Sequence, residues 1–109
     1  LTVNVFWTAL APMPETYTGF VHLIGPDGQI AAQDDHELGR GVYRTLAWSA
    51  GEIIREKYEL KAPSTGQRGA YYVRAGAYRF PSLTRLAAQS LTLPVHDNAI
   101  TLTTLQAGP

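Results

Sequence analysis

The sequence predicts an all-β domain, an antiparallel immunoglobulin-like β-sandwich of about seven strands. Two observations lead to this prediction. Short segments that alternate in polarity, or that are rich in β-branched and aromatic residues, recur along the whole 109-residue chain. Residues that favour turns separate these segments. Helical patterns are nearly absent, and only residues 83–90 could form one or two helical turns.

Seven segments have the strand pattern, in chain order 1–10, 17–24, 29–34, 53–60, 70–80, 86–93 and 99–105. The first ends at Pro12 and Pro14, because proline cannot donate to a sheet ladder. Pro26-Asp27-Gly28 joins the second and third, since proline presets φ and glycine accepts the left-handed position. A break at 63–66 ends the fourth segment, and Asp97-Asn98 forms the last turn.

Composition indicates one domain spanning residues 1–109, large enough to bury roughly two thirds of its unfolded surface. Nine basic and nine acidic side chains cancel, which argues against a nucleic acid partner. Cysteine is absent, so disulfides and thiolate chemistry are excluded. The chain starts inside a strand pattern without methionine and ends in Gly108-Pro109. We therefore expect a domain excised from a longer protein, and we expect the fragment itself to be soluble because no apolar run reaches ~20 residues.

Strand alternation assigns the core. We expect one core to contain five inward residues, Val21, Leu23, Tyr58, Tyr71 and Val73. Trp48 lies near the end of a long loop, 37–51, which we expect to cap an open end of the sandwich. Glu56 shares the inward phase of Tyr58, and a buried carboxylate needs a partner. Arg44 and Arg74 are the candidates, and the structural interpretation of this pair is favoured over a catalytic one.

Searches for reaction motifs find no nucleophile elbow, no H-E-x-x-H, no Walker loop and no dinucleotide fingerprint. The run Asp34-Asp35-His36-Glu37 is the only cluster of metal-competent side chains. Without a second, spaced cluster it is typical of a solvated loop. We therefore predict no metal, no cofactor and no catalytic residue.

Polar residues gather around the hairpin that contains His22. We expect this histidine to point outward, toward Ala31 or Gln33 of the next strand, and to hydrogen-bond across the hairpin. The predicted polar cluster, interpreted as structural, comprises His22, Gln33, Asp34, Asp35, Arg44, Trp48 and Glu56. An enzyme using His22, Asp34 and Glu56 as a glycosidase-like or metal-assisted site is the minority hypothesis, since a defined carboxylate separation cannot be read from sequence.

An ordered set of short motifs covers nearly the whole chain. The set is Phe20-Val21-His22-Leu23, Pro26-Asp27-Gly28, Gln33 with Asp34 or Asp35, Trp48, Gly51-Glu52, Tyr58 and Leu60 before Pro63, and the run from Tyr71 to Tyr78. This set resembles the β-sandwich domain at the C-terminal end of bacterial polytopic membrane glycosyltransferases. Those proteins are similar to dolichyl-phosphate-mannose protein mannosyltransferases and to aminoarabinose transferases. Arg44, in place of an expected proline, and Phe80-Pro81-Ser82, in place of an Asp-rich turn, depart from the pattern.

The resemblance implies an extracytoplasmic accessory module of a membrane protein, with the transferase chemistry in the membrane-embedded part. The leading hypothesis is a noncatalytic positioning or interaction domain that packs on that part or on an acceptor protein. The alternative is a carbohydrate-binding module, in which outward Tyr72 and Tyr78 around Arg74 form a stacking surface for a glycan. An outward tyrosine pair is also common as cross-strand support.

Overall fold

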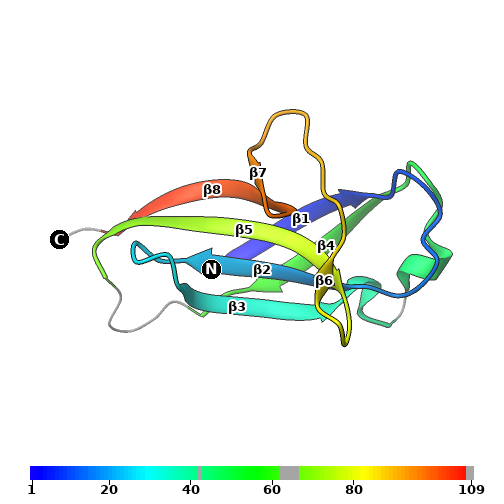
Figure 1. Ribbon diagram of the computed structural model, residues 1–109, viewed down its shortest axis with the longest axis horizontal. Coiled ribbons are helices and arrows are strands. Elements are labelled where there is room, and N and C mark those ends of the chain that lie inside the picture. The colour runs from blue at the N-terminus through cyan, green and yellow to red at the C-terminus, as the bar shows by residue number, and fades with distance from the viewer. Residues whose placement is uncertain (42, 62–66, 108–109) are drawn as a thin grey trace.

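In the computed structural model, which describes residues 1–41, 43–61 and 67–107, the chain forms eight strands and two short 3-10 helices. The strands are β1 (Thr2–Thr8), β2 (Thr18–Ile24), β3 (Ile30–Glu37), β4 (Ile53–Glu59), β5 (Gly69–Arg79), β6 (Thr84–Arg85), β7 (Val95–His96) and β8 (Ala99–Ala107). The helices are η1 (Leu38–Gly41) and η2 (Thr45–Ala47). The predicted all-β antiparallel fold is confirmed (Figure 1).

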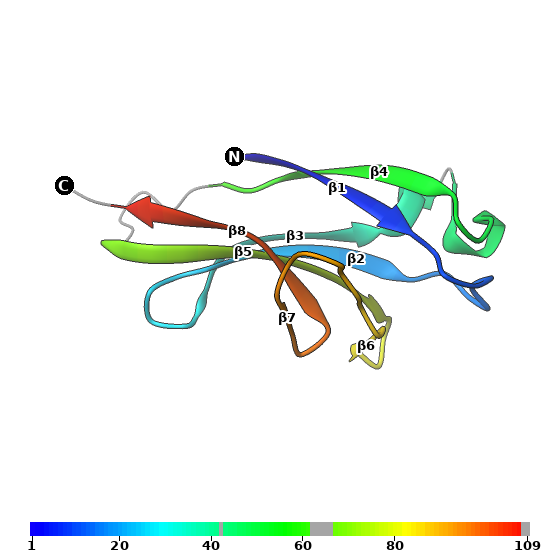
Figure 2. The same ribbon diagram turned by 90° about the horizontal axis from the view of Figure 1, so that it is seen from above.

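The strands form two unequal layers, which Figure 2 shows edge on. One layer is a two-stranded sheet of β1 and β4. The other is a six-stranded sheet with the order β3-β2-β5-β8-β7, and β6 pairs with β5 outside this path. The turns around β6 and β7 extend from the large sheet on the side opposite to β1 and β4 (Figure 2). A two-stranded layer cannot cover the whole inner face of the large sheet, and this difference shapes the candidate site.

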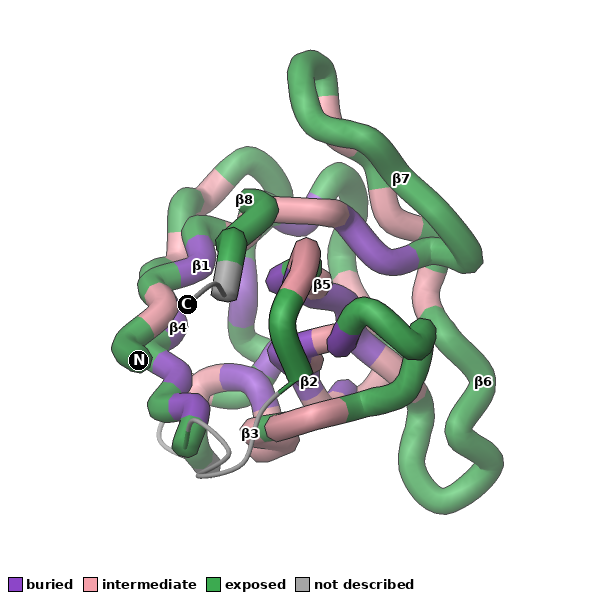
Figure 3. Tube along the Cα trace, turned by 90° about the vertical axis from the view of Figure 1, so that its left-hand side faces the viewer, coloured by how far each residue is buried: buried purple, intermediate pink, exposed green. Residues whose placement is uncertain are grey.

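The main core lies between the two sheets, where Figure 3 shows the buried positions. Its buried members are Val5, Val21, Leu23, Tyr58, Leu60, Tyr71, Val73 and Ala75. All five residues predicted for one core are in this cluster. Tyr58 and Val21 are fully buried. The predicted phases of the central strands are therefore confirmed.

A second buried cluster closes one end of the sandwich. Trp48 packs there with Leu38, Tyr17, Ala9 and Ala77. The Trp48 indole Nε1 donates a hydrogen bond to a backbone carbonyl of the same loop at 2.8 Å. The capping role predicted for the loop that carries Trp48 agrees with this packing.

Both predicted hairpin turns are present. The backbone N–H of Gly25 donates to the carbonyl of Gln29 at 2.8 Å, and Gly28 has the left-handed φ of 81° that the turn requires. Asp97 and Asn98 both have positive φ, 50° and 56°, and they directly join β7 to β8. Two such residues form the tight turn whose twist matches antiparallel strands.

Residues 86–93, predicted as a strand, do not form one. The segment between β6 and β7 makes scattered bonds instead: Leu86 N–H donates to the carbonyl of Ala77 at 2.9 Å, and Leu93 N–H donates to Ser90 Oγ at 3.0 Å. A side chain that bonds the nearby backbone competes with a ladder, and no neighbouring strand is available there among the described residues. The helical turns that the sequence allowed at 83–90 are also absent from this described segment. The predicted break at 63–66 and the chain end at Gly108-Pro109 lie outside the described residues.

Candidate functional site

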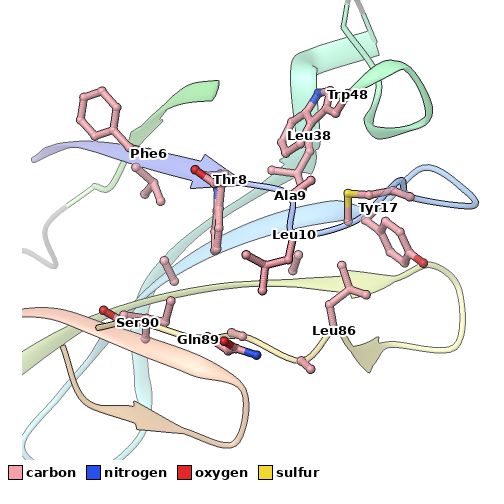
Figure 4. A pocket seen from close by; sticks show the side chains of 18 of the residues that line it. Phe6, Thr8, Ala9, Leu10, Tyr17, Leu38, Trp48, Leu86, Gln89 and Ser90 are labelled. Carbon is pink, nitrogen blue, oxygen red and sulfur yellow. The ribbon is translucent and has the colours of Figure 1, made fainter. Parts of the chain in front are cut away.

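An apolar cleft opens along one side of the sandwich, between β1 and the large sheet (Figure 4). Its volume is about 700 Å³, within the usual range of ligand pockets. The inner face of the large sheet forms the floor, through Ala75 and Ala77 of β5 and Ile100 and Leu102 of β8. Two alanines on β5 leave room above the sheet where larger side chains would fill it.

Two chain segments form the walls of the cleft. On one side are β1 and residues 9–14, and Figure 4 shows Leu10 directed toward the large sheet. On the other side, half-buried Leu86, Ala88 and Ser90 alternate with exposed neighbours. Leu86 points up from that wall in Figure 4. The segment predicted as a strand therefore serves as a wall of the cleft.

The chemistry of the cleft is that of an uncharged binding surface. None of the described residues that line it is acidic or basic. Its polar side chains include Asn4, Thr8, Gln89 and Ser90. Such a lining favours the binding of apolar groups.

The large sheet divides the predicted polar cluster into two groups. β3 continues to Glu37, paired with Thr18 of β2, whereas the prediction ended this strand at Asp34. Successive side chains of a strand point to opposite faces, so the charged run 34–37 is split. Asp34 Oδ2 accepts a hydrogen bond from the backbone N–H of Glu59 on the inner side, at 2.8 Å. Among the residues the structure describes, no three His, Asp or Glu side chains gather as a metal site would require.

The partners predicted for Glu56 are wrong. Its Oε1 accepts a hydrogen bond from the backbone N–H of Gly39 at 2.5 Å, and its Oε2 lies 3.1 Å from Nε2 of His36. Arg74 belongs to the outward phase of β5, on the other face of the large sheet. Arg44 instead lies near Glu37, with Nε 3.5 Å from Oε1. The residue that sequence reasoning missed is His36, because the run containing it was interpreted as a loop.

His36 also contacts the core directly. Its ring stacks on that of Tyr58 with centroids 4.4 Å apart and planes at 28°. Its Nδ1 is 3.6 Å from Oδ1 of Asp34. Burial raises the pKa of the Tyr58 phenol far above its ordinary value. These groups lie inside the interface between β3 and β4, where they connect the two strands, and none of them lines the apolar cleft.

A second polar group lies on the outer face of the large sheet. His22 Nε2 is 3.6 Å from Asp35 Oδ1 across the hairpin, and the Tyr78 hydroxyl donates to Asp35 Oδ2 at 3.0 Å. Desolvation by burial lowers the pKa of His22, against the opposing effect of Asp35. Desolvation, together with the hydrogen bond to Asp35, raises the pKa of Tyr78. His22 thus faces outward, as predicted. The predicted hydrogen bond across the hairpin is not formed: the ring lies at ion-pair distance from Asp35, and Gln33, which is directly opposite in register, is exposed.

The predicted stacking surface is interrupted. Tyr72 is 36% exposed, and the guanidinium carbon of Arg74 lies 5.5 Å from the centre of its ring. Tyr78 is six residues further along β5, roughly 20 Å away at the usual rise per residue. Its hydroxyl is bonded to Asp35, and its strand position pairs with Arg85 of β6. The two tyrosines therefore do not meet on one sugar ring.

Sequence reasoning did not find the cleft. The available signals were Leu10, an apolar residue after the first strand that is 74% exposed in the structure, and the small residues in the inward phase of β5. Large apolar side chains at the surface beside small buried ones indicate an uncovered part of a core. That reading requires knowing that β1 lies at a sheet edge, which no local pattern reveals.

Comparisons of the chain with protein-family models, with curated proteins and with solved structures returned no match. Within the described residues, no helix has the length and apolar character needed to cross a membrane.

Proposed function

We propose that this chain is a noncatalytic interaction domain that positions another protein region, and that the apolar cleft is its docking surface. The observation that carries the proposal is the cleft of about 700 Å³ beside β1, lined among the described residues without any charged side chain. Exposed Leu10 extends the apolar surface at its rim. Burial of apolar area is the main driving force of protein association, so such a surface favours a protein partner.

The resemblance of the sequence to the accessory domains of polytopic membrane glycosyltransferases supplies the setting of the proposal. In that setting the domain lies on the extracytoplasmic side and docks on the membrane-embedded part of its parent or on an acceptor protein. In that case the parent protein carries out the transferase reaction, and this domain positions the membrane-embedded part or the acceptor protein. The buried contacts of Glu56 and the paired contacts of Asp35 support a structural role for the predicted polar residues, because these groups are bonded within the fold.

Site-specific photocrosslinking tests this proposal. A benzophenone amino acid is placed at Leu10, in the cleft, or at Tyr72, on the opposite face of the large sheet, within the complete gene product in its native membrane. Crosslinks from Leu10 to one protein region, absent from Tyr72, are the expected result. Crosslinks only from Tyr72, or none from either position, would contradict docking through the cleft.

A carbohydrate-binding role is the second candidate, and one observation favours it. Tyr72 is exposed beside the Arg74 guanidinium, an aromatic face with a hydrogen-bond donor close by. Titration with mannose, arabinose and glucose oligomers tests it, repeated on the Tyr72→Ala, Tyr78→Ala double variant and on Tyr72→Ala alone. We expect at best millimolar dissociation constants, on the order of 4 kcal/mol, because the surface is shallow. Binding that survives both variants would place any sugar site elsewhere.

A further inference from the structure

The free edge of β1 presents a regular row of backbone groups. Leu1 and Leu60 exchange both hydrogen bonds of a pair, at 3.0 Å and 2.8 Å. In an antiparallel ladder, bonded and non-bonded pairs alternate. The residues of β1 that bond to β4 are therefore Val3, Val5 and Trp7. The N–H and C=O groups of Thr2, Asn4, Phe6 and Thr8 point away from β4.

No strand pairs with this edge in the described part of the chain. The corresponding edge of β4 is treated differently. Asp34 Oδ2 accepts from the N–H of Glu59 at 2.8 Å, and Arg40 Nη2 donates to the carbonyl of Lys57 at 2.6 Å. The side chains of Asp34 and Arg40 thus bond to the backbone groups at the β4 edge, so no further strand can pair there. Natural proteins commonly protect exposed edges in this way. The β1 edge has no such protection among the described residues.

The open edge borders the apolar cleft. Asn4, Phe6 and Thr8 all belong to the lining of the cleft. A strand added to β1 would lie about 4.8 Å from it, in the plane of the small sheet and over the inner face of β5 and β8. Alternate side chains of that strand would enter the cleft, above Ala75 and Ala77. One occupant would thereby pair the edge and cover the exposed part of the core.

We propose that the cleft accepts one extended segment of a partner polypeptide, which pairs with the free edge of β1 and places uncharged apolar side chains at alternate positions into the cleft. This inference rests on the proposed docking function and names the chemical form of the partner. An extended peptide supplies the backbone donors and acceptors that the edge needs, and pockets for alternate side chains give such complexes their specificity. A lipid or a small apolar molecule would fill the cleft but leave these backbone groups unpaired. The uncharged lining selects apolar, uncharged side chains on the inserted face.

The test uses a synthetic peptide of alternating threonine and valine with a lysine at each end, followed by NMR. Binding is expected to slow the amide exchange of Asn4, Phe6 and Thr8, with little change at Val5 and Trp7, whose amides already bond to β4. Two further peptides carry backbone N-methyl groups, one on every threonine and the other on every valine. Only one set of N–H groups can face β1, so one methylated peptide is expected to lose binding and the other to keep it. Methylated threonines abolish binding if the added strand is antiparallel.

Two protein variants complete the test. Phe6→Pro removes an N–H that the β1–β4 ladder does not use, and an edge strand tolerates proline at such a position. We expect it to weaken peptide binding about tenfold, whereas Phe6→Thr, which keeps the N–H, changes binding less than about threefold. Thermal unfolding shows whether each variant is folded. If Phe6→Pro does not fold, the methylated peptides alone decide whether strand pairing occurs.

Several outcomes would overturn the inference. Equal binding of both methylated peptides would mean that the cleft accepts apolar groups without strand pairing. No binding of any peptide at millimolar concentration would exclude strand addition by this chemistry. If the protein forms concentration-dependent dimers and Phe6→Pro abolishes them, the occupant of the cleft is a second copy of the chain and not a partner polypeptide. If crosslinks from Leu10 persist in the Phe6→Pro gene product, docking through the cleft stands and only strand pairing fails.

Discussion

Glu56 Oε2 lies 3.1 Å from His36 Nε2 in the interior of the molecule, where the Glu56 side chain is only 4% exposed. Its other carboxylate oxygen accepts the backbone N–H of Gly39, which has a left-handed φ of 78°. The carboxylate therefore fastens β4 to the end of β3 and to the turn that follows it. A buried carboxylate with two such bonds is a structural clamp between the sheets.

Substituting Glu56 tests the clamp. Glu56→Ala should lower the free energy of unfolding by about 2 to 4 kcal/mol, because it leaves the Gly39 N–H and the His36 ring without a buried partner. Glu56→Gln, which keeps an acceptor of similar shape, should cost about 1 to 2 kcal/mol. Urea denaturation measures both values. The matched control is Glu59→Gln on the same strand, whose 57% exposed side chain should matter by less than about 0.5 kcal/mol. Equal effects at the two positions would contradict the clamp.

The ring of Tyr58 should contribute more to stability than its hydroxyl. The side chain is fully buried, and its hydroxyl has no hydrogen-bond partner within the described residues. Tyr58→Ala should cost roughly 3 to 5 kcal/mol through the cavity it leaves and the lost stacking on His36. Tyr58→Phe keeps the ring and should change stability by less than about 1 kcal/mol. Chemical denaturation of the two variants separates the contribution of the ring from that of the hydroxyl. A large loss of stability in Tyr58→Phe would mean that the hydroxyl does make a stabilising hydrogen bond.

Much of the fold could be predicted from the sequence because its signals are local. The turn at Pro26-Asp27-Gly28, the inward phase of Tyr58 and the two faces of β5 follow from turn chemistry and period-two alternation. The failure at 86–93 has a physical cause. Alternation predicts that a segment has a buried face and an exposed face, and Leu86, Ala88 and Ser90 are indeed half-buried between exposed neighbours. It does not state whether a neighbouring strand exists to pair with the segment.

The candidate site was harder to predict because it depends on relations between distant segments. Asp34 and Asp35 are adjacent in sequence, yet β3 places them on opposite faces of the large sheet. The partner of Glu56 could not be chosen without knowing that β3 of the large sheet packs against β4 of the small sheet. The cleft requires the sheet order itself, since it exists only because β1 is an edge strand with nothing beside it in the described residues.

His22 should make the domain less stable in mild acid. Desolvation holds the folded pKa of this histidine below its ordinary 6.5. At pH values between the folded pKa and 6.5, the unfolded chain binds more protons than the folded chain. The stabilising effect of neutral His22 is therefore full above pH 6.5 and is lost as the pH falls toward the folded pKa. We expect the melting temperature to fall between about pH 7.5 and pH 5, and to fall less in His22→Gln. His96→Gln is the matched control, since that side chain is 70% exposed. An unchanged pH profile in His22→Gln would contradict the assignment.

The outer face of the large sheet contains one tightly packed contact, between Gly76 and Phe20. Phe20 belongs to the outward phase of β2 but is only 1% exposed, because its ring lies over Gly76 and under the guanidinium of Arg85, 4.8 Å away. A Cβ at position 76 would come within 2.5 Å of the ring and 3.0 Å of the carbonyl oxygen of Asn98.

Gly76→Ala should therefore cost about 1 to 3 kcal/mol through overpacking, although alanine usually favours a folded chain over glycine. Phe20→Leu removes the ring atoms that clash. In the double variant we expect part of the Gly76→Ala cost to disappear, which appears as a coupling of at least about 0.5 kcal/mol in a double-mutant cycle of urea denaturation. Strictly additive effects would mean that the ring does not rest on Gly76, and that Phe20 is buried by the turns around β6 and β7 alone.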